Sequence, residues 1–384
     1  TPARLKFQAR AEDLHVVENL IVNKEQRIPD ISYFQTTPDT VSDENFVLMH
    51  AEEFHTSFWG HTALLGLQEL FLLPNYAGYA NSAASSLVPT NTDVFDLAHA
   101  QGGLVAYVHP FDARPDPRAV TESRALPIDV ALGKIDYLEV MGFSNHLITS
   151  EIWYRLLNCG FRIPAGAGTD AFPNFASLRG PAGLLRVFAR IGQRLDHGAF
   201  LAAIRQGRTF VTNAPLVEFA LEAPLPAGTG QSTSAQIGDE IRLPAGRHRL
   251  HALVSLKSQV PIDHLEIVRN GAVVTSVPLG GDRRQAEARV PLDVDRSGWY
   301  IVRAYADGSR APILDLYPFA STSPVYVTVA DQPLRSAQDA EFFLAWIDSV
   351  RKDVEAYTGW NTSAERNSTL ALIAKARAEF ERRR

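Results

Sequence analysis

Cysteine is almost absent from this 384-residue chain, which contains a single one, Cys159. One thiol cannot form an intrachain disulfide, and it cannot build a cysteine-rich zinc or iron–sulfur site. Any metal ion would therefore be held by histidine and carboxylate side chains. Cys159 itself ends an apolar stretch that starts at Leu156, and we interpret it as a small buried hydrophobic residue.

The chain also lacks a long hydrophobic run and a large excess of charge of one sign. No apolar stretch approaches the roughly 20 residues that span a bilayer, and no signal-peptide pattern opens the chain. A net charge of -6 gives no general attraction to a phosphate backbone. We expect a soluble protein without a membrane span or a nucleic-acid partner. Cytoplasm and periplasm both remain open, as does the oligomeric state.

Two common catalytic motifs are missing as well. No Gly-x-Ser-x-Gly sequence occurs, which disfavours a Ser-His-Asp hydrolase. The glycine-rich run Gly166–Gly168 has no Lys-Ser/Thr pair after it, which disfavours a phosphate-binding loop.

Hydrophobic patterning divides the chain into three parts. Residues 1–215 alternate strand-like apolar runs with helix-like segments, the pattern of parallel βα units. Residues 216–332 contain short alternating runs broken by glycine and proline, which is typical of an antiparallel β-sandwich. In residues 333–384, apolar residues at three-to-four spacing predict a pair of helices packed as a hairpin. We therefore expect an α/β domain, then a sandwich domain, then two C-terminal helices.

Local signals predict several individual elements. The pair Asn270-Gly271 predicts a tight β-hairpin turn, because both positions of such a turn need positive φ. Residues 91–101 predict a helix with Thr92 as the N-cap, and residues 150–158 predict another that ends at Gly160. The strands expected in the first part are 16–22, 46–50, 63–67, 104–109, 137–140 and 162–167.

Histidine is concentrated near the start of the chain, where seven of the 11 histidines precede residue 150. These are His15, His50, His55, His61, His99, His109 and His146. The densest group runs from His50 through Glu53 and His55 to His61, directly after an apolar strand-like run. Imidazole and carboxylate groups at a strand end suit a divalent cation, and barrel folds place such groups at the C-terminal rim of their strands. The alternative is a set of polar strand-end residues with no shared ligand.

Two further strand-like runs end in residues of the same kind. The run from Leu104 delivers His109, and the run from Ile163 delivers Asp170 after small residues that allow close backbone approach. A structural histidine and a helix N-cap are the respective alternatives. After a third strand, Asn145 and His146 are weaker candidates for binding substrate or a second metal.

Other polar residues are better explained without a site. His248, His251 and His264 fall in sandwich-type strands, where ordinary cross-strand contacts are expected. The arginines that follow Asp170 could hold an anionic substrate group, although salt bridges between elements of the first domain are favoured. These arginines are Arg179, Arg186 and Arg190.

Taken together, four strand endings resemble the polymerase-and-histidinol-phosphatase (PHP) superfamily, and most closely its carbaryl-hydrolase-like branch. The endings are Glu52-Glu53 with Gly60-His61, Val108-His109-Pro110, Leu138-Glu139-Val140 and Gly168-Thr169-Asp170. Residues 203–213 and 318–327 are similar to the ends of that branch's barrel and of its appended sandwich. The resemblance covers residues 10 to 350.

This resemblance implies a distorted (β/α)7 barrel that holds divalent ions, usually zinc, manganese or iron. It also implies hydrolysis of ester, amide, carbamate or phosphoester bonds in a small-molecule substrate. The matching positions imply metal ligands at Glu53, His61, His109 and Asp170, with one or two ions in this chain. A water activated by the metal would attack the substrate, and His55 or His146 would carry the proton.

The chain departs from the family pattern at three places. The family's opening His-x-His strand is absent from these residues, and we expect it just before Thr1. Asn23 stands in place of the next histidine, and the usual Asp-x-His ends here in Phe172. A degenerate barrel that serves as a binding or scaffold protein is therefore the main alternative to an enzyme. A carbohydrate-active sandwich protein is the third, for which only Trp299, Tyr300, Tyr305 and Tyr317 offer aromatic rings.

Overall fold

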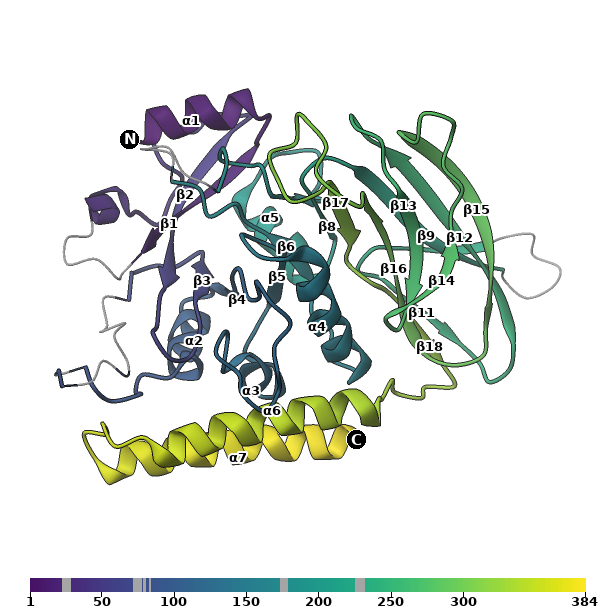
Figure 1. Cartoon of the computed structure of the whole chain (residues 1–384). Helices are drawn as coiled ribbons and strands as arrows, with labels where there is room; N and C mark the ends of the chain where they lie inside the picture. Colours follow the sequence, from purple (N-terminus) through teal and green to yellow (C-terminus); the bar gives the residue numbers. More distant parts are fainter. Residues whose placement is uncertain (23–28, 72–77, 79–80, 83, 173–178, 225–231) are drawn as a thin grey trace.

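Figure 1 shows the computed structural model of the chain, which describes all residues except 23–28, 72–77, 79–80, 83, 173–178 and 225–231. The described part is a mixed α/β structure with seven α-helices, one curled sheet and two further sheets built mainly of antiparallel strands. The expected α/β class is therefore confirmed. Asn23, singled out in the sequence, lies outside the described residues.

The first sheet has six strands in sequence order and curls into half a barrel (Figure 1). They are β1 (Val16–Val22), β2 (Val47–Phe54), β3 (Thr62–Leu65), β4 (Leu104–Tyr107), β5 (Tyr137–Met141) and β6 (Ala165–Ala167). Parallel pairing is confirmed for β1 with β2, β4 with β5, and β5 with β6. It is wrong for β3, which is antiparallel to both neighbours. The connection over residues 55–61 explains this, because a parallel crossover needs about a dozen residues or more.

Helices connect and flank these strands. They are α1 (Pro2–Ala11), α2 (Asn91–Ala100), α3 (Leu126–Ala131), α4 (His146–Asn158) and α5 (His197–Arg205), with a 3-10 turn at Pro29–Tyr33. The N-cap of α2 is Thr90, whose side chain accepts a hydrogen bond from Asp93 N. The prediction of Thr92 as the N-cap is wrong, because Thr92 lies within the helix and its hydroxyl donates a hydrogen bond to Asp129 instead. As predicted, α4 is followed by Gly160, which adopts a positive φ of 80°.

Two more sheets follow. The four-stranded sheet contains β10 (Ser232–Gln236), β9 (Leu216–Pro224), β12 (His248–Lys257) and β15 (Gln285–Val294). The eight-stranded sheet contains β11 (Glu240–Leu243), β18 (Val325–Val329), β16 (Gly298–Tyr305), β17 (Phe319–Thr322), β8 (Thr209–Thr212), β7 (Arg186–Ala189), β13 (His264–Arg269) and β14 (Ala272–Ser276). Buried apolar residues of both sheets, such as Val254 and Val302, share one hydrophobic cluster. Strands β7 and β8 precede residue 215, where the first domain was expected to end, yet they pair within the eight-stranded sheet. This sheet therefore contains strands from both sides of the expected boundary.

The hairpin turn between β13 and β14 forms as expected. Asn270 and Gly271 both have positive φ, at 49° and 84°. Asn270 Oδ1 also accepts a hydrogen bond from Trp299 N at 3.0 Å, which ties the turn to β16.

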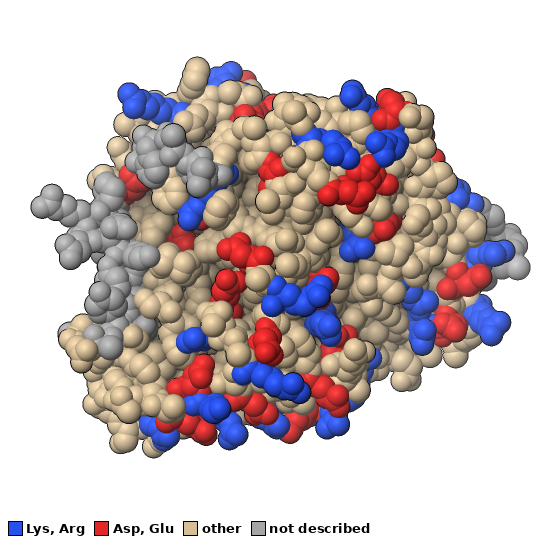
Figure 2. All heavy atoms as spheres, in the orientation of Figure 1, with Lys and Arg blue, Asp and Glu red and all other residues tan. Residues whose placement is uncertain are grey.

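The two C-terminal helices are confirmed as α6 (Ala337–Ala356) and α7 (Ser363–Arg383), which run side by side along the lower edge of Figure 1. They pack on α3 and α4 and bury Phe343 and Trp346 completely. Acidic and basic side chains are interspersed on this lower edge (Figure 2), unlike a continuous basic stripe that follows a phosphate backbone. Among the described helices, none combines the length and the apolar character needed to cross a membrane.

Candidate metal centre

Three side chains with metal-binding atoms meet where β2 ends and β3 begins. Glu53 is on β2, His55 follows that strand, and His61 directly precedes β3. One ligand atom from each lies within 4.8 Å of those of the other two. The antiparallel pairing of β2 with β3 brings this about, because Glu53 lies opposite Ala63 and the chain returns past its own strand end.

Two more of the sequence candidates adjoin this group. His109 Nε2 lies 3.4 Å from Glu53 Oε1 and 3.9 Å from Asp170 Oδ2. His61 Nδ1 lies 3.5 Å from the same Glu53 oxygen. The rings of His55 and His61 are 3.3 Å apart between centroids, and those of His61 and His109 are 5.1 Å apart. The structure thus gathers Glu53, His55, His61, His109 and Asp170, five of the six site residues predicted from the sequence, into one cluster.

The spacing inside the cluster differs from that of histidine–carboxylate contacts elsewhere. Five other histidines approach a carboxylate oxygen directly, at 2.6 to 2.9 Å. Around Glu53 Oε1 the two contacts are 3.4 and 3.5 Å. Ligands bound to one cation at about 2.1 Å with tetrahedral angles lie about 3.4 Å from each other. The spacing therefore fits ligand atoms that share a cation better than a direct charge-assisted hydrogen bond, which is about 2.7–2.9 Å long.

Electrostatic coupling favours the charged forms of Glu53 and His109. Burial by itself would raise the pKa of Glu53, but its contact with the His109 ring and the charges of the nearby imidazoles lower it below its usual value. Burial would lower the pKa of His109, but Glu53, Glu139 and Asp170 raise it to about 9. Burial and the charge of Glu53 raise the pKa of Asp170. Several carboxylates thus compete for positive charge here, which a divalent cation would supply.

Glu139 is a buried carboxyl group behind the cluster. It lies on β5 with 6% of its surface exposed, and its Oε2 accepts a hydrogen bond from His109 N. Burial raises its pKa to about 8. Side chains at Gly142 and Gly168 would overlap its carboxylate, so these glycines provide the space that it occupies. The sequence contained a signal for this role, namely an acidic residue inside an apolar strand with glycine soon after it.

The backbone is also unusual at two of the candidate ligands. His109 has a φ of 32° and Asp170 a φ of 54°, a region that side chains other than glycine seldom adopt. Strained conformations of this kind persist when the surrounding structure holds them, and they cluster at functional sites. Both residues come shortly after a strand end, His109 after β4 and Asp170 after β6.

His146, the sixth predicted site residue, lies in a different environment. It begins α4 and is buried, with Nε2 2.9 Å from Asp315 Oδ2 and its ring against Tyr317 and Phe319. None of its contacts in the described residues involves the Glu53 cluster. Asn145 caps α4 and accepts a hydrogen bond from the Tyr317 hydroxyl. These two residues join the first part of the chain to the loop before β17, and we do not assign them to the metal centre.

Two polar residues that precede Glu53 on β2 have other partners. His50 is buried and lies 2.9 Å from Asp39. Glu52 accepts a hydrogen bond from Phe71 N at 2.7 Å, and burial raises the pKa of Glu52 to about 8. Because side chains alternate along a strand, His50 and Glu52 point to the face of β2 opposite to that of Glu53.

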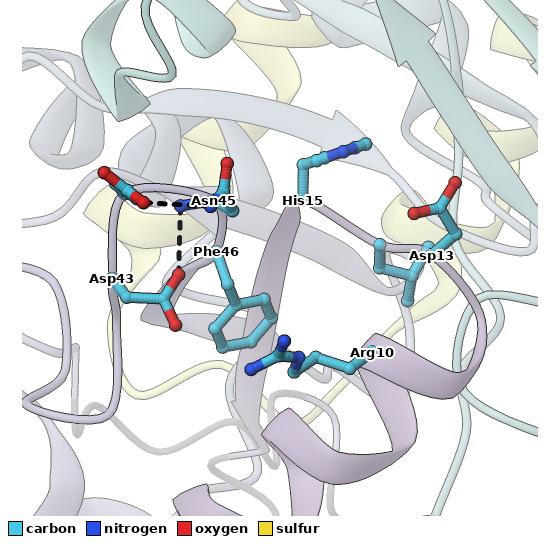
Figure 3. Close-up of a pocket in the computed structure, with 8 residues that line it drawn as sticks. Arg10, Asp13, His15, Asp43, Asn45 and Phe46 are labelled. Atoms are coloured by element: carbon cyan, nitrogen blue, oxygen red, sulfur yellow. Dashed lines mark hydrogen bonds between the residues drawn. The ribbon is translucent and has the colours of Figure 1, made fainter.

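A separate hollow of about 760 Å³ lies at the other end of β2 (Figure 3). Arg10, Asp13, His15 and Asp43 contribute to its wall, and His15 points away from Arg10 and Asp43 in this view. The hollow begins beside Phe46, seven residues before Glu53, which corresponds to roughly 23 Å along an extended strand. Its polar groups are engaged locally, as in the ion pair of Lys6 with Asp43. It does not share residues with the Glu53 cluster.

Comparison of the chain with protein-family models, with curated proteins and with solved structures found no match. The arguments for function therefore depend on the cluster itself.

Proposed function

We propose that this protein is a metal-dependent hydrolase whose centre is formed by Glu53, His55 and His61, with His109 and Asp170 completing the ligand set. The observation that carries the proposal is the spacing around Glu53 Oε1, 3.4 and 3.5 Å to two imidazole nitrogens. Mixed imidazole and carboxylate ligands suit zinc, manganese or iron, and the set is large enough for one or two ions.

A divalent cation in this set supplies Lewis acidity, which lowers the pKa of water and polarises a carbonyl or phosphoryl oxygen. The protein's own groups prepare the centre. Glu139 holds the backbone of His109 through a hydrogen bond, and His61 and His109 face the same Glu53 oxygen. The ring of His55 lies against that of His61, and both side chains are partly exposed, so His55 can serve as a ligand or carry a proton to the leaving group.

We propose that this centre cleaves ester, amide, carbamate or phosphoester bonds. We also propose, from the sequence motifs, that the chain is related to the PHP superfamily. The half-barrel sheet and the two later sheets are consistent with a PHP-type barrel followed by a sandwich. The (β/α)7 barrel and the sandwich remain part of this proposal.

Metal analysis of the purified protein is the decisive experiment. We expect one or two equivalents of zinc, manganese or iron. A chelator should remove this metal and abolish the hydrolysis of aryl ester, carbamate or phosphoester test substrates. Asp170→Asn and His109→Ala should each weaken metal affinity by roughly tenfold or more, on the order of the loss seen when groups around a metal site are changed. His251→Ala, on β12, is the control and should retain the metal. Equal metal content in all four proteins would reject the ligand assignment.

The His55→Ala variant separates the two roles of His55. Loss of metal identifies His55 as a ligand, whereas retained metal with a reduced kcat identifies it as the proton carrier.

A non-catalytic binding protein on the same fold is the second candidate. The ion pair between Arg179 and Asp170 favours it, because a guanidinium already neutralises one of the proposed ligands. Absence of metal from the wild-type protein after reloading would support this candidate over the hydrolase.

A further inference from the structure

Arg179 occupies an unusual place at the edge of the metal centre. Its guanidinium forms an ion pair with the Asp170 carboxylate and lies 3.4 Å from the Asp170 carbonyl oxygen. Its Cζ is 4.9 Å from the ring centroid of Phe143 and 4.7 Å from that of Phe172. Phe143 follows β5, the strand of Glu139, and Phe172 comes two residues after Asp170. The segments that form the centre therefore also supply two aromatic partners for one cation.

The two rings are more exposed than residues whose role is core packing. Phe143 is 41% exposed and Phe172 is 38% exposed, and the side chain of Arg179 is 29% exposed. Aromatic residues that pack in the core, such as Trp153 and Phe111, are fully buried. Exposed apolar groups next to a polar centre are characteristic of ligand-binding surfaces. Stacking on aromatic rings also restrains the plane of the guanidinium, which prepares it for binding in a defined orientation.

The chemistry of Asp170 connects this group to the reaction. Asp170 Oδ2 contacts Arg179 and also lies 3.9 Å from His109 Nε2. A cation held by Asp170 would replace Arg179 as the counter-charge of that carboxylate. The guanidinium would remain beside the centre through its two aromatic contacts, and its fork of N–H donors matches the two oxygens of a carboxylate or a phosphate.

We propose that Arg179, Phe143 and Phe172 form a substrate clamp, and that the substrates carry an oxyanion, carboxylate or phosphate, on a flat apolar group close to the bond that is cleaved. The inference rests on the proposed hydrolase function, for which it names the substrate class. The guanidinium binds the oxyanion, and the rings pack against the flat group. A neutral substrate of the same shape lacks the charged contact and binds more weakly.

Direct binding tests the clamp without requiring turnover. Zinc-loaded protein is titrated calorimetrically with benzoate, with phenyl phosphate and with neutral benzyl alcohol. Arg179→Met should weaken the binding of at least one of the two anions by roughly tenfold or more, as expected for loss of a hydrogen bond between charged groups, and should leave benzyl alcohol unchanged. Arg179→Lys should fall between, because it keeps the charge and loses the fork. Arg249→Met removes an exposed arginine from the surface of β12 and is the matched control, with unchanged binding.

Metal content and kinetics provide the second set of readouts. Arg179→Met should keep at least as much zinc as the wild type, because it removes a competitor for Asp170. With 4-carboxyphenyl acetate and phenyl acetate as a matched pair, it should raise KM for the carboxylated ester alone. In the calorimetric titrations, the anion whose binding Arg179→Met weakens more, benzoate or phenyl phosphate, identifies the preferred oxyanion.

Several outcomes would overturn the clamp. These are failure of both anions to bind the wild type, equal anion binding by wild type and Arg179→Met, or loss of zinc from Arg179→Met. Failure of the hydrolase proposal is recognisable separately, since zinc-loaded wild type would then cleave neither ester while the anion comparison still decides the clamp.

Discussion

Glu53 is only 5% exposed and is surrounded by three imidazole rings, so its charge must be balanced locally. Burying an unpaired carboxylate costs several kcal/mol, of which nearby positive charge recovers a large part. Protonated His109 provides that charge when no cation is present, since its pKa is about 9. The same arrangement accepts a divalent cation in place of the proton. At the scale of single residues, the centre is thus defined by an excess of carboxylate over permanent positive charge.

Gly168→Ala tests how closely the residues behind the centre are packed. The new methyl group would overlap the Glu139 carboxylate, so Glu139 or the end of β6 must move. We expect a loss of about 1–3 kcal/mol in the free energy of unfolding, the usual cost of overpacking a buried site, together with weaker metal binding. Urea unfolding and metal titration measure the two effects.

Gly192→Ala is the control for this substitution, because nothing lies within 4 Å of the position that its methyl group would occupy. Adding Glu139→Ala to Gly168→Ala should restore part of the stability by removing the overlap. An unchanged Gly168→Ala protein would show that Glu139 is not confined by this glycine.

At the scale of elements, a buried polar network joins α2, α3 and β4 beneath the sheet. Asp129 of α3 accepts hydrogen bonds from Thr92 of α2 and Tyr107 of β4. Asn91 donates to the Tyr107 hydroxyl and to the carbonyl oxygen of Gly60, both at 3.0 Å. Gly60 directly precedes His61, so the network also anchors the segment that presents this histidine to the centre.

The pH dependence of stability should carry the signature of Asp129. Burial raises the pKa of Asp129 from 3.8 to about 7, against the opposing hydrogen bonds from Thr92 and Tyr107. The folded state therefore binds more protons than the unfolded state between these values, and stability falls as the pH rises from about 4 through 7. Asp129→Asn should remove the share of this decline that Asp129 contributes, a few kcal/mol at most, and leave the shares of Glu52 and Glu139, whose pKa values are also raised.

Urea unfolding of wild type and Asp129→Asn between pH 4 and pH 8 measures this difference. Asp293→Asn, at a side chain that is 84% exposed, serves as the control and should follow the wild-type curve. Parallel curves for wild type and Asp129→Asn would contradict the assignment.

At the scale of the whole molecule, the C-terminal hairpin supports the strand end that carries His109. Trp346 of α6 is fully buried, its ring lies 5.8 Å from that of Phe111, and its Nε1 donates to Arg124 O at 3.1 Å. Phe111 is two residues after His109 in the chain. The helices and the first sheet therefore share one hydrophobic cluster.

Trp346→Ala should lower the free energy of unfolding by about 3–5 kcal/mol, because it leaves a large cavity in that cluster. Leu316→Ala, at a residue that is 57% exposed, should change it by less than about 0.5 kcal/mol. Chemical denaturation with a structural signal such as circular dichroism compares the two. A small effect of Trp346→Ala would mean that the hairpin is only loosely attached to the rest of the protein.

Most element types could be predicted from the sequence because they depend on local periodicity and turn chemistry. The strand at 16–22, the Asn270-Gly271 turn and the two C-terminal helices all form where the pattern places them. The kinds of residue available for a metal, histidine and carboxylate without cysteine, were likewise evident from composition and from strand ends.

Pairings between distant segments were decided only by the tertiary structure. The antiparallel β3 and the entry of β7 and β8 into the later sheet depend on which strand edges meet, which local periodicity does not encode. The same holds at the centre. His146 and His109 look alike as strand-end histidines, yet packing directs one to Asp315 and the other to Glu53. Sequence by itself determined which groups this protein can use, and the tertiary structure decided which of them face one another, because long-range packing sets the direction of each strand end.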